Sequence, residues 1–326
     1  MKKSTLQFWT TVVLLAIPVL MIWFNGTKAL NAILWNKPTQ GTIGQIAQTK
    51  NHEKQALNFG IYDPYNSCSD SSISWEYSQL YITWLNFDRQ MIEQKIKGIQ
   101  QQGTKVILII EPWAKLETPL FDDIVAGQYD TEINSIESLL KDVKDTVYVA
   151  WGHEMDQDLT TRYDWSSNNT EGYKAAYKYV HTKLNTAKIK WIWAPVGKNN
   201  CNDYWPGDAY VNMIGLPIYS FPDFDYKYYG KIRSFEEAFD EKYELVENHN
   251  KPIFLIEFGV SGSEDYKAYW LREAFKSFRK FELLKLVVFF NSKDTEGVWG
   301  DQYKTPDWTV NQELLSAYIK TYKQLE

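Results

Sequence analysis

Two glutamates of this chain stand where carboxyl chemistry is feasible. Glu154 follows the apolar run VYVAW, and Glu257 lies at the end of the run IFLIEF. One protonated and one ionised carboxyl group can together give a proton to a leaving glycosidic oxygen and attack or stabilise the anomeric carbon. A single glutamate at a strand end is more often an ion-pair partner or a helix cap. The chemistry therefore depends on whether the fold brings both residues to one place.

Short apolar runs alternate with amphipathic ones from residue 56 onward, which predicts strands and helices in turn. We expect strands at 57–62, 80–86, 105–111, 147–151, 190–195, 211–219, 253–258 and 284–290, and helices at 88–102, 131–143, 171–186, 234–248, 264–279 and 311–325. Eight strands separated by helices predict a (β/α)8 TIM barrel. The rival is a doubly wound open sheet, which usually begins with a glycine-rich turn, and the sequence has none after its first strand.

In such a barrel the chemistry lies at the edge where the strands end. The fourth and seventh strands would bring Glu154 and Glu257 to this edge from nearly opposite sides. Other strands end on polar or aromatic residues, namely Glu111-Pro112-Trp113, His153 beside Glu154, Trp193, Tyr219 and Asn291.

Several of these residues have a structural alternative. His153 either hydrogen-bonds within the site or is a metal ligand, although no second ligand is spaced to join it. Tyr219 either belongs to the core or donates its hydroxyl to the nucleophilic carboxylate. The four tryptophans near the strand ends are sugar platforms or core residues: Trp113, Trp165, Trp193 and Trp299.

The composition narrows the class of ligand. Of the 326 residues 16% are aromatic, including 14 Trp, and flat rings are what sugar C–H faces stack on. The net charge of −6 argues against a nucleic-acid partner, because polyanion binding requires a basic surface. Cys68 and Cys201 either form a disulfide, if the domain is exported, or remain unpaired thiols. No cysteine or histidine spacing suggests a metal site, and we expect no cofactor.

The N-terminus is predicted to meet a membrane. Lys2 and Lys3 precede an apolar run at 8–24, at the short end of what spans a bilayer. We expect residues 1–30 to be an uncleaved signal anchor, with a cleaved signal peptide or a buried helix as alternatives. Residues 31–55 would be a tether, and residues 56–326 a catalytic domain outside the cell membrane, by the positive-inside rule.

Two motifs resemble glycoside hydrolase family 26. Residues 126–156, which end in GHEMD, are similar to the segment that leads to that family's acid/base, and KPIFLIEFG at 251–259 is similar to its nucleophile strand. EPW, WAP and IGLPIY match further strand ends, so that the resemblance covers about residues 56–320. It implies that Glu154 is the acid/base and Glu257 the nucleophile of a retaining enzyme.

The resemblance also assigns binding residues. His153 matches the histidine beside the acid/base, Tyr219 the tyrosine that contacts the nucleophile, and Trp165 a tryptophan of the substrate-binding stretch. Three positions depart from the family: Asp156 replaces an asparagine, Ala150-Trp151-Gly152 replaces an arginine-containing segment, and Pro217 replaces a common aspartate. Asp156 could raise the pKa of the acid/base or alter the contacts with the sugar.

The expected activity is endo-hydrolysis of a β-linked polysaccharide, with mannan slightly favoured over β-glucan. A role beside a membrane polysaccharide synthase, trimming the exported polymer, is a further hypothesis. Two alternatives remain: a barrel that binds polysaccharide without cleaving it, and a membrane-bound transglycosylase that uses the same two glutamates.

Overall fold

The computed structural model describes residues 57–68, 73–115, 118–157, 163–184 and 188–325. The predicted membrane segment and the tether, residues 1–30 and 31–55, lie outside these described residues. No helix within the described ranges combines the length and the apolar character that a membrane crossing requires.

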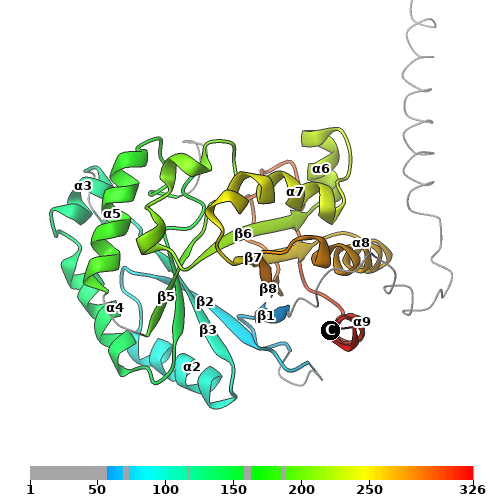
Figure 1. Ribbon diagram of the computed structural model, residues 1–326, viewed down its shortest axis with the longest axis horizontal. Coiled ribbons are helices and arrows are strands. Elements are labelled where there is room, and N and C mark those ends of the chain that lie inside the picture. Colours follow the sequence, from blue (N-terminus) through cyan, green and yellow to red (C-terminus); the bar gives the residue numbers. More distant parts are fainter. Residues whose placement is uncertain (1–56, 69–72, 116–117, 158–162, 185–187, 326) are drawn as a thin grey trace, which may run out of the picture. The chain divides into compact units, whose positions relative to one another are not determined.

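Eight parallel strands form a closed barrel in which each strand pairs with the next and β8 pairs with β1 (Figure 1). The strands are β1 Asn58–Tyr62, β2 Tyr77–Thr83, β3 Lys105–Glu111, β4 Val147–Trp151, β5 Ile189–Trp193, β6 Met213–Ser220, β7 Ile253–Val260 and β8 Leu284–Phe290. The predicted TIM barrel is therefore confirmed.

Helices follow most of the strands and cover the outside of the barrel (Figure 1). Their bounds are α2 Arg89–Gln101, α3 Leu120–Val125, α4 Asp130–Asp142, α5 Thr170–Lys183, α6 Pro222–Tyr229, α7 Phe235–Val246, α8 Glu264–Ser277 and α9 Gln312–Gln324. Capping explains several starts: Ser234 and Glu237 form a reciprocal capping box at α7, and Ser263 caps α8.

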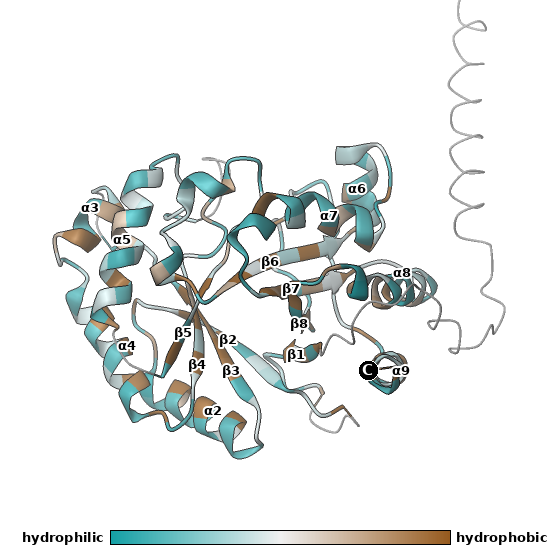
Figure 2. Ribbon diagram, viewed as in Figure 1, coloured by the Kyte–Doolittle hydropathy of each residue, from teal (hydrophilic) through white to brown (hydrophobic). Residues whose placement is uncertain are grey.

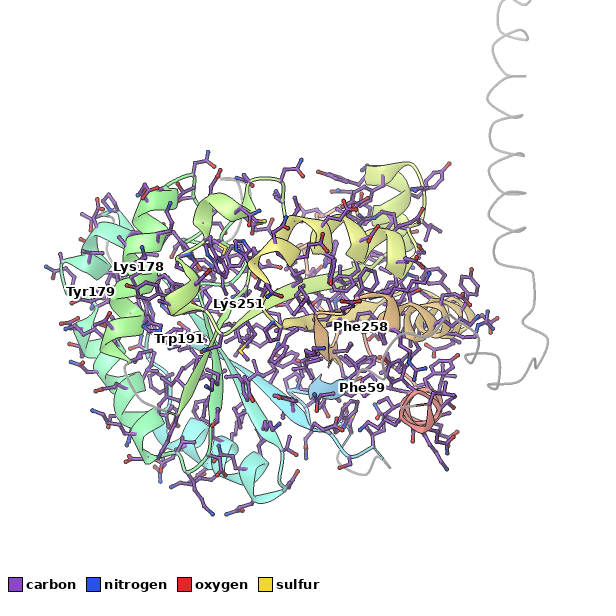
Figure 3. All side chains as sticks on the ribbon, in the orientation of Figure 1. Phe59, Lys178, Tyr179, Trp191, Lys251 and Phe258 are labelled. Carbon is purple, nitrogen blue, oxygen red and sulfur yellow. The ribbon has the colours of Figure 1, made fainter. Side chains whose placement is uncertain are left out.

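The hydrophobic core has two layers, one inside the barrel and one between the strands and the helices. On β3, Ile107 and Ile109 belong to the inner layer, whereas Leu108 belongs to the outer one. This alternation is the two-residue period of a strand. Apolar residues colour the strands brown in Figure 2, and Phe59 and Phe258, labelled in Figure 3, lie in the outer layer.

The expected elements agree closely with the observed ones, with three exceptions. The expected strands at 105–111, 147–151 and 284–290 have the observed bounds. The second strand lies three residues earlier than expected, and the short helices α3 and α6 were not expected. Cys68 and Cys201 are both buried free thiols, which is the unpaired alternative.

Candidate active site

Glu257 faces the barrel interior because β7 contains a bulge. Leu255 pairs with Leu216 of β6 while Glu257 pairs with Pro217, so that Ile256 is an extra residue in β7. Leu255 and Phe258 pack in the outer layer, and Ile256 in the inner one. Without the bulge, strict alternation would turn Glu257 toward the helices together with Leu255. The bulge re-aims this carboxylate into the barrel, a use of bulges common at active sites.

Two phenol hydroxyls bind the two oxygens of the Glu257 carboxylate. Tyr81 on β2 donates to Oε1 at 2.6 Å, and Tyr219 on β6 donates to Oε2 at 2.9 Å. Gln79 in turn donates to the Tyr81 hydroxyl at 3.1 Å. Glu257 is only 7% exposed. Donors on both oxygens stabilise negative charge on a buried carboxylate and fix its orientation.

Gly259, two residues after Glu257, leaves room for the ring of Tyr219. A Cβ at this position would lie 2.8 Å from the ring of Tyr219. Only glycine therefore leaves room for the tyrosine ring to lie against β7 and to reach Glu257.

The phenols near Glu257 stay protonated at any ordinary pH. Burial, and after it the charge of Glu257, raises the pKa of Tyr81 and of Tyr219 well above the usual value. Burial also raises the pKa of Tyr62, at the end of β1, to about 12, with further contributions from Tyr65, Glu111, Glu257 and Asp294. This edge of the barrel is therefore a negative environment in which the tyrosines act as hydrogen-bond donors.

Glu154 lies in a tight turn directly after β4, in a left-handed backbone conformation. Its φ is 55°, and that of Gly152 is 58°. The Glu154 N–H donates to the carbonyl of Ala194 at 2.6 Å, which ties the turn to the end of β5. Gln157 donates to Oε2 of the Glu154 carboxylate at 3.1 Å. A left-handed conformation costs a residue other than glycine about 1–3 kcal/mol and is concentrated at functional sites.

His153 is buried among aromatic rings beside this turn. Its ring lies 5.8 Å from that of Tyr81, 5.2 Å from that of Tyr163 and 5.7 Å from that of Trp165. His153 thus lies beside the tyrosine that binds Glu257 and beside the turn that carries Glu154. Within the described residues, no group of three or more His, Cys, Asp or Glu side chains is arranged to hold a metal ion.

Lys242 is a cation whose charge interacts with both candidate carboxylates. It reaches in from α7, its stem packs against Gly197, and its ammonium donates to the carbonyl of Pro217 at 2.7 Å. Burial lowers the pKa of Lys242 to about 8, and the negative charges of Glu154, Asp156 and Glu257 partly oppose this shift. The ring of His153, the neighbour of Glu154, lies 5.8 Å from that of Tyr81, which binds Glu257, so the two glutamates lie in the same part of the barrel.

The lowered pKa of Lys242 predicts a pH-dependent stability. Its folded pKa of about 8 lies below the ordinary 10.5, so the unfolded chain binds more protons between these values. Unfolding free energy should therefore rise with pH across this window, by on the order of 3 kcal/mol. Urea unfolding of wild type and Lys242→Met between pH 7.5 and 10.5 measures it. The variant should lack this rise, whereas Lys95→Met, at an exposed position of α2, should retain it. Parallel curves for wild type and Lys242→Met would contradict the assignment.

Asp156, one of the residues expected to bind substrate, holds the loop that follows β5. Its buried carboxylate accepts the N–H groups of Val196 at 2.6 Å, Gly197 at 3.0 Å and Lys198 at 2.9 Å. Both oxygens are used by the backbone after β5, which is the loop that packs on Lys242. The aspartate at this position, which departs from the family pattern, therefore has a structural role.

The expected sugar platforms divide into two groups. Trp113 and Trp299 are partly exposed, and each indole N–H is held by a carboxylate: Glu111 at 3.1 Å and Asp294 at 2.8 Å, respectively. Trp165 is buried, stacked on Tyr163 and bonded to the His153 carbonyl.

Trp193 is also buried, and it packs in the outer layer against Trp205 at 5.0 Å. The reason is strand parity, which turns Trp193 toward the helices and away from the barrel interior. Trp165 and Trp193 are therefore packing residues at this edge of the barrel, and neither exposes a ring face on which a sugar could stack.

Three residues of the site were missed from sequence: Tyr81, Lys242 and Gln157. Misplacing the second strand by three residues hid Tyr81, although the alternation of Tyr77, Gln79 and Tyr81 carried the signal. Lys242 lies in an ordinary amphipathic helix, and nothing in its sequence context distinguishes it from an exposed lysine.

Replacing Tyr81 with Phe removes a hydrogen bond to Glu257 and should lower the enzymatic activity. Hydrogen bonds to charged groups contribute about 1.5–3 kcal/mol, which corresponds to a loss in kcat/KM of about 10- to 100-fold. Tyr77→Phe is the matched control, because Tyr77 lies on the same strand and its hydroxyl donates to Tyr148 at 3.4 Å. Steady-state kinetics on a soluble β-glycan distinguish them, and an equal effect of both variants would refute the role of Tyr81.

No known protein-family model matches the chain. Among curated proteins, it is 25% identical to Endoglucanase H of Acetivibrio thermocellus over 258 residues, which cover 73% of this chain and 26% of that protein. It is 24% identical to a β-1,3-xylanase of a Vibrio species over 231 residues, 61% of this chain and 47% of that protein. The chain thus spans about a quarter to a half of the length of these relatives.

Solved structures share the fold. A GH26 β-mannanase from Bacteroides ovatus has a TM-score of 0.58 at 14% identity, covering 84% of this chain and 89% of that one. The GH26 domain of an endo-β-mannanase/endo-β-glucanase from Prevotella bryantii has a TM-score of 0.53 at 13% identity, covering 81% and 89%. Both the curated relatives and these neighbours are glycoside hydrolases, and they confirm the resemblance of this chain to glycoside hydrolase family 26.

Proposed function

We propose that this chain is an endo-acting, retaining β-glycanase that cleaves a mannan- or β-glucan-type polysaccharide by double displacement. The single observation that carries the proposal is the Glu257 carboxylate, which is buried, turned inward by a bulge and held on both oxygens by Tyr81 and Tyr219. A buried carboxylate with fixed orientation and stabilised charge is suited to act as a nucleophile.

In the first step, Glu257 attacks the anomeric carbon while Glu154 gives its proton to the departing glycosidic oxygen. The carbon–oxygen bond of the substrate breaks, and an ester forms between the sugar and Glu257. In the second step, Glu154, now ionised, takes a proton from water as the water attacks the same carbon. The ester breaks and Glu257 is again a carboxylate, so that the anomeric configuration is retained.

Lys242 and the tyrosines supply the electrostatics of this cycle. The cation near both glutamates compensates negative charge as it moves from Glu257 to Glu154 during the first step. Gln157, hydrogen-bonded to Glu154, orients the group that must face the leaving oxygen. Fixed charges and donors of this kind need no reorganisation during the reaction.

The proposed substrate class is based on the names of the relatives and of the structural neighbours taken together. Endoglucanase, β-1,3-xylanase and β-mannanase all occur among the relatives and neighbours. A reducing-sugar assay on mannan, lichenan, carboxymethylcellulose and β-1,3-xylan tests the proposal. Release of reducing ends from mannan or lichenan is expected, with a rapid fall in viscosity that indicates internal cleavage. No release from any of the four polymers would contradict it.

A barrel that only binds polysaccharide is the weaker alternative. Its support is the set of departures from the family pattern around Glu154, and one of them, Asp156, has a role in the loop after β5 that is compatible with catalysis. Transglycosylation uses the same two glutamates and differs in the acceptor. Product chains longer than the substrate oligosaccharide, seen by mass spectrometry, would identify it.

We further propose that the apolar run at 8–24 anchors the enzyme to the cell membrane with the barrel outside, where it trims an exported polysaccharide. The support is the sequence, with two lysines before the apolar run and a polar tether after it. Fractionation of cells that express the full chain tests the anchor. Recovery of the protein in a carbonate-washed membrane pellet is expected, and recovery in the medium would favour a cleaved signal.

A further inference from the structure

Aromatic rings form a continuous series that leads away from the nucleophile. The ring of Tyr219, whose hydroxyl binds Glu257, lies 5.8 Å from that of Trp299 in the loop after β8. Trp299 lies 5.0 Å from Phe224 on α6, and Phe224 lies 5.2 Å from Tyr228, with ring planes only 9° apart. The series thus runs from a buried catalytic group to Tyr228, which is 70% exposed.

These three outer residues, Trp299, Phe224 and Tyr228, are here called the α6 aromatic track. Both of its elements begin at the carboxyl edge of the barrel, because α6 follows β6 and the Trp299 loop follows β8 (Figure 1). Phe224 and Tyr228 are four residues apart and therefore share one face of α6.

One ring of the track, that of Trp299, is held in place by a hydrogen bond before any ligand binds. The indole N–H of Trp299 donates to Asp294 at 2.8 Å, and Asp294 also accepts from the indole of Trp308 at 3.1 Å. Beside the track, the guanidinium of Arg233 lies 3.6 Å from the centre of the Tyr229 ring. Rings that are already ordered lose little conformational freedom on binding, which favours affinity.

The exposed aromatic rings of α6 indicate a ligand-binding surface. Besides Tyr228, the eight-residue helix α6 exposes Tyr226 by 57% and Tyr229 by 41%. A cluster of exposed aromatic side chains marks a binding surface, because water solvates the ring faces poorly. Sugar C–H faces are suited to such exposed rings.

We propose that the α6 aromatic track binds the sugar units of a β-linked polysaccharide that lie beyond the bond being cleaved. The inference rests on the proposed function and deepens it, since it places a polymer-binding surface on one side of the catalytic glutamates. A lipid surface is another ligand for exposed tyrosines. The polysaccharide is favoured because the track is continuous with Tyr219 and hence with Glu257, which a membrane contact does not require.

Binding without turnover tests the track. The full chain carrying Glu257→Gln, kept in a detergent without a sugar headgroup, is run in native gels that contain lichenan or glucomannan, and its retardation gives a Kd. Adding Phe224→Ala or Tyr228→Ala should weaken the Kd by about tenfold. Tyr228→Phe should bind like the background, because it keeps the flat ring.

Tyr269→Ala is the matched control. Tyr269 is also an exposed tyrosine, 49% accessible, with a guanidinium beside its ring, but it lies on α8. This variant should retain the affinity of the background. An equal loss in Tyr269→Ala and Tyr228→Ala, or no loss in either, would overturn the track.

The outcomes separate the track from the catalytic proposal. Hydrolysis by wild type together with unchanged binding by Tyr228→Ala would refute the track and leave the catalytic proposal standing. Binding through Tyr228 without hydrolysis by wild type would support the track and refute catalysis. A dye on Tyr228→Cys that shifts to the blue in phosphatidylcholine liposomes, and is unchanged by lichenan, would refute the track in favour of lipid.

Discussion

The variant Glu257→Gln is expected to lose hydrolysis almost completely, with kcat reduced by a factor on the order of 10⁴ or more. The amide is nearly the same size as the carboxylate but cannot form the ester with the anomeric carbon. One of the two tyrosines, Tyr81 or Tyr219, keeps an acceptor in the amide oxygen, and the hydroxyl of the other can accept from the amide NH2, so the fold should be maintained. The measurement is kcat on a soluble β-glycan together with thermal unfolding of the same sample.

The control for this variant is Glu244→Gln, at an exposed position of α7. It removes a carboxylate of the same chain without touching the barrel interior, and its kcat should equal that of wild type. Azide should partly restore the activity of Glu257→Ala and form an α-glycosyl azide, because azide then attacks the sugar directly. Glu257→Gln with full activity would exclude this residue as the nucleophile.

The variant Glu154→Gln is expected to lose about 10²- to 10⁴-fold in kcat on polysaccharide, because the leaving oxygen no longer receives a proton. The loss should be far smaller for the first step on an aryl β-glycoside with a good leaving group, which departs without a proton. Azide should accelerate the second step of Glu154→Ala and give a β-glycosyl azide.

Comparing kcat/KM, which reports the first step, on polysaccharide and on aryl glycoside for both glutamate variants therefore assigns the two roles. Equal losses in kcat/KM of Glu154→Gln on both substrates would contradict an acid role. A strong dependence of Glu257→Gln on the leaving group would exchange the roles of Glu154 and Glu257.

The barrel could be predicted from sequence because most of its strands are continuous apolar runs between turn residues. β3 and β8 are examples, since both of their faces are buried and no other element competes for such a sequence. The second strand is predicted three residues too late because the inner face of β2 carries Tyr77, Gln79 and Tyr81. The hydrophobic pattern is therefore weak at the start of this strand. Polar residues inside a barrel strand are a feature of the site, and they obscure the strand that carries them.

The orientation of Glu257, the proposed nucleophile, could not be predicted from sequence. Alternation from Leu255 would turn Glu257 outward, and only the bulge at Ile256, visible in the pairing with β6 and β8, turns it inward. The resemblance to a family assigns a role to Glu257 without giving this reason. In a strand of continuous apolar residues, a single extra residue does not change the visible hydrophobic pattern.

The roles of the tryptophans and of Asp156 needed the structure for a different reason. Trp193 follows strand parity outward, and Asp156 is bound by three backbone N–H groups of a loop whose path no local pattern indicates. Similarly, α6 is short and has no clear period, and its importance comes from its contact with Trp299. Long-range packing of this kind is set by tertiary structure.

Trapping of the covalent intermediate tests the central claim most directly. A 2-deoxy-2-fluoro β-glycoside with a fluoride leaving group forms the ester quickly and hydrolyses it slowly. Mass spectrometry of the intact chain, followed by peptide mapping, should find one added sugar on Glu257. An active enzyme that forms no adduct and releases its first product with inverted anomeric configuration would contradict the account, as would an adduct on any other residue.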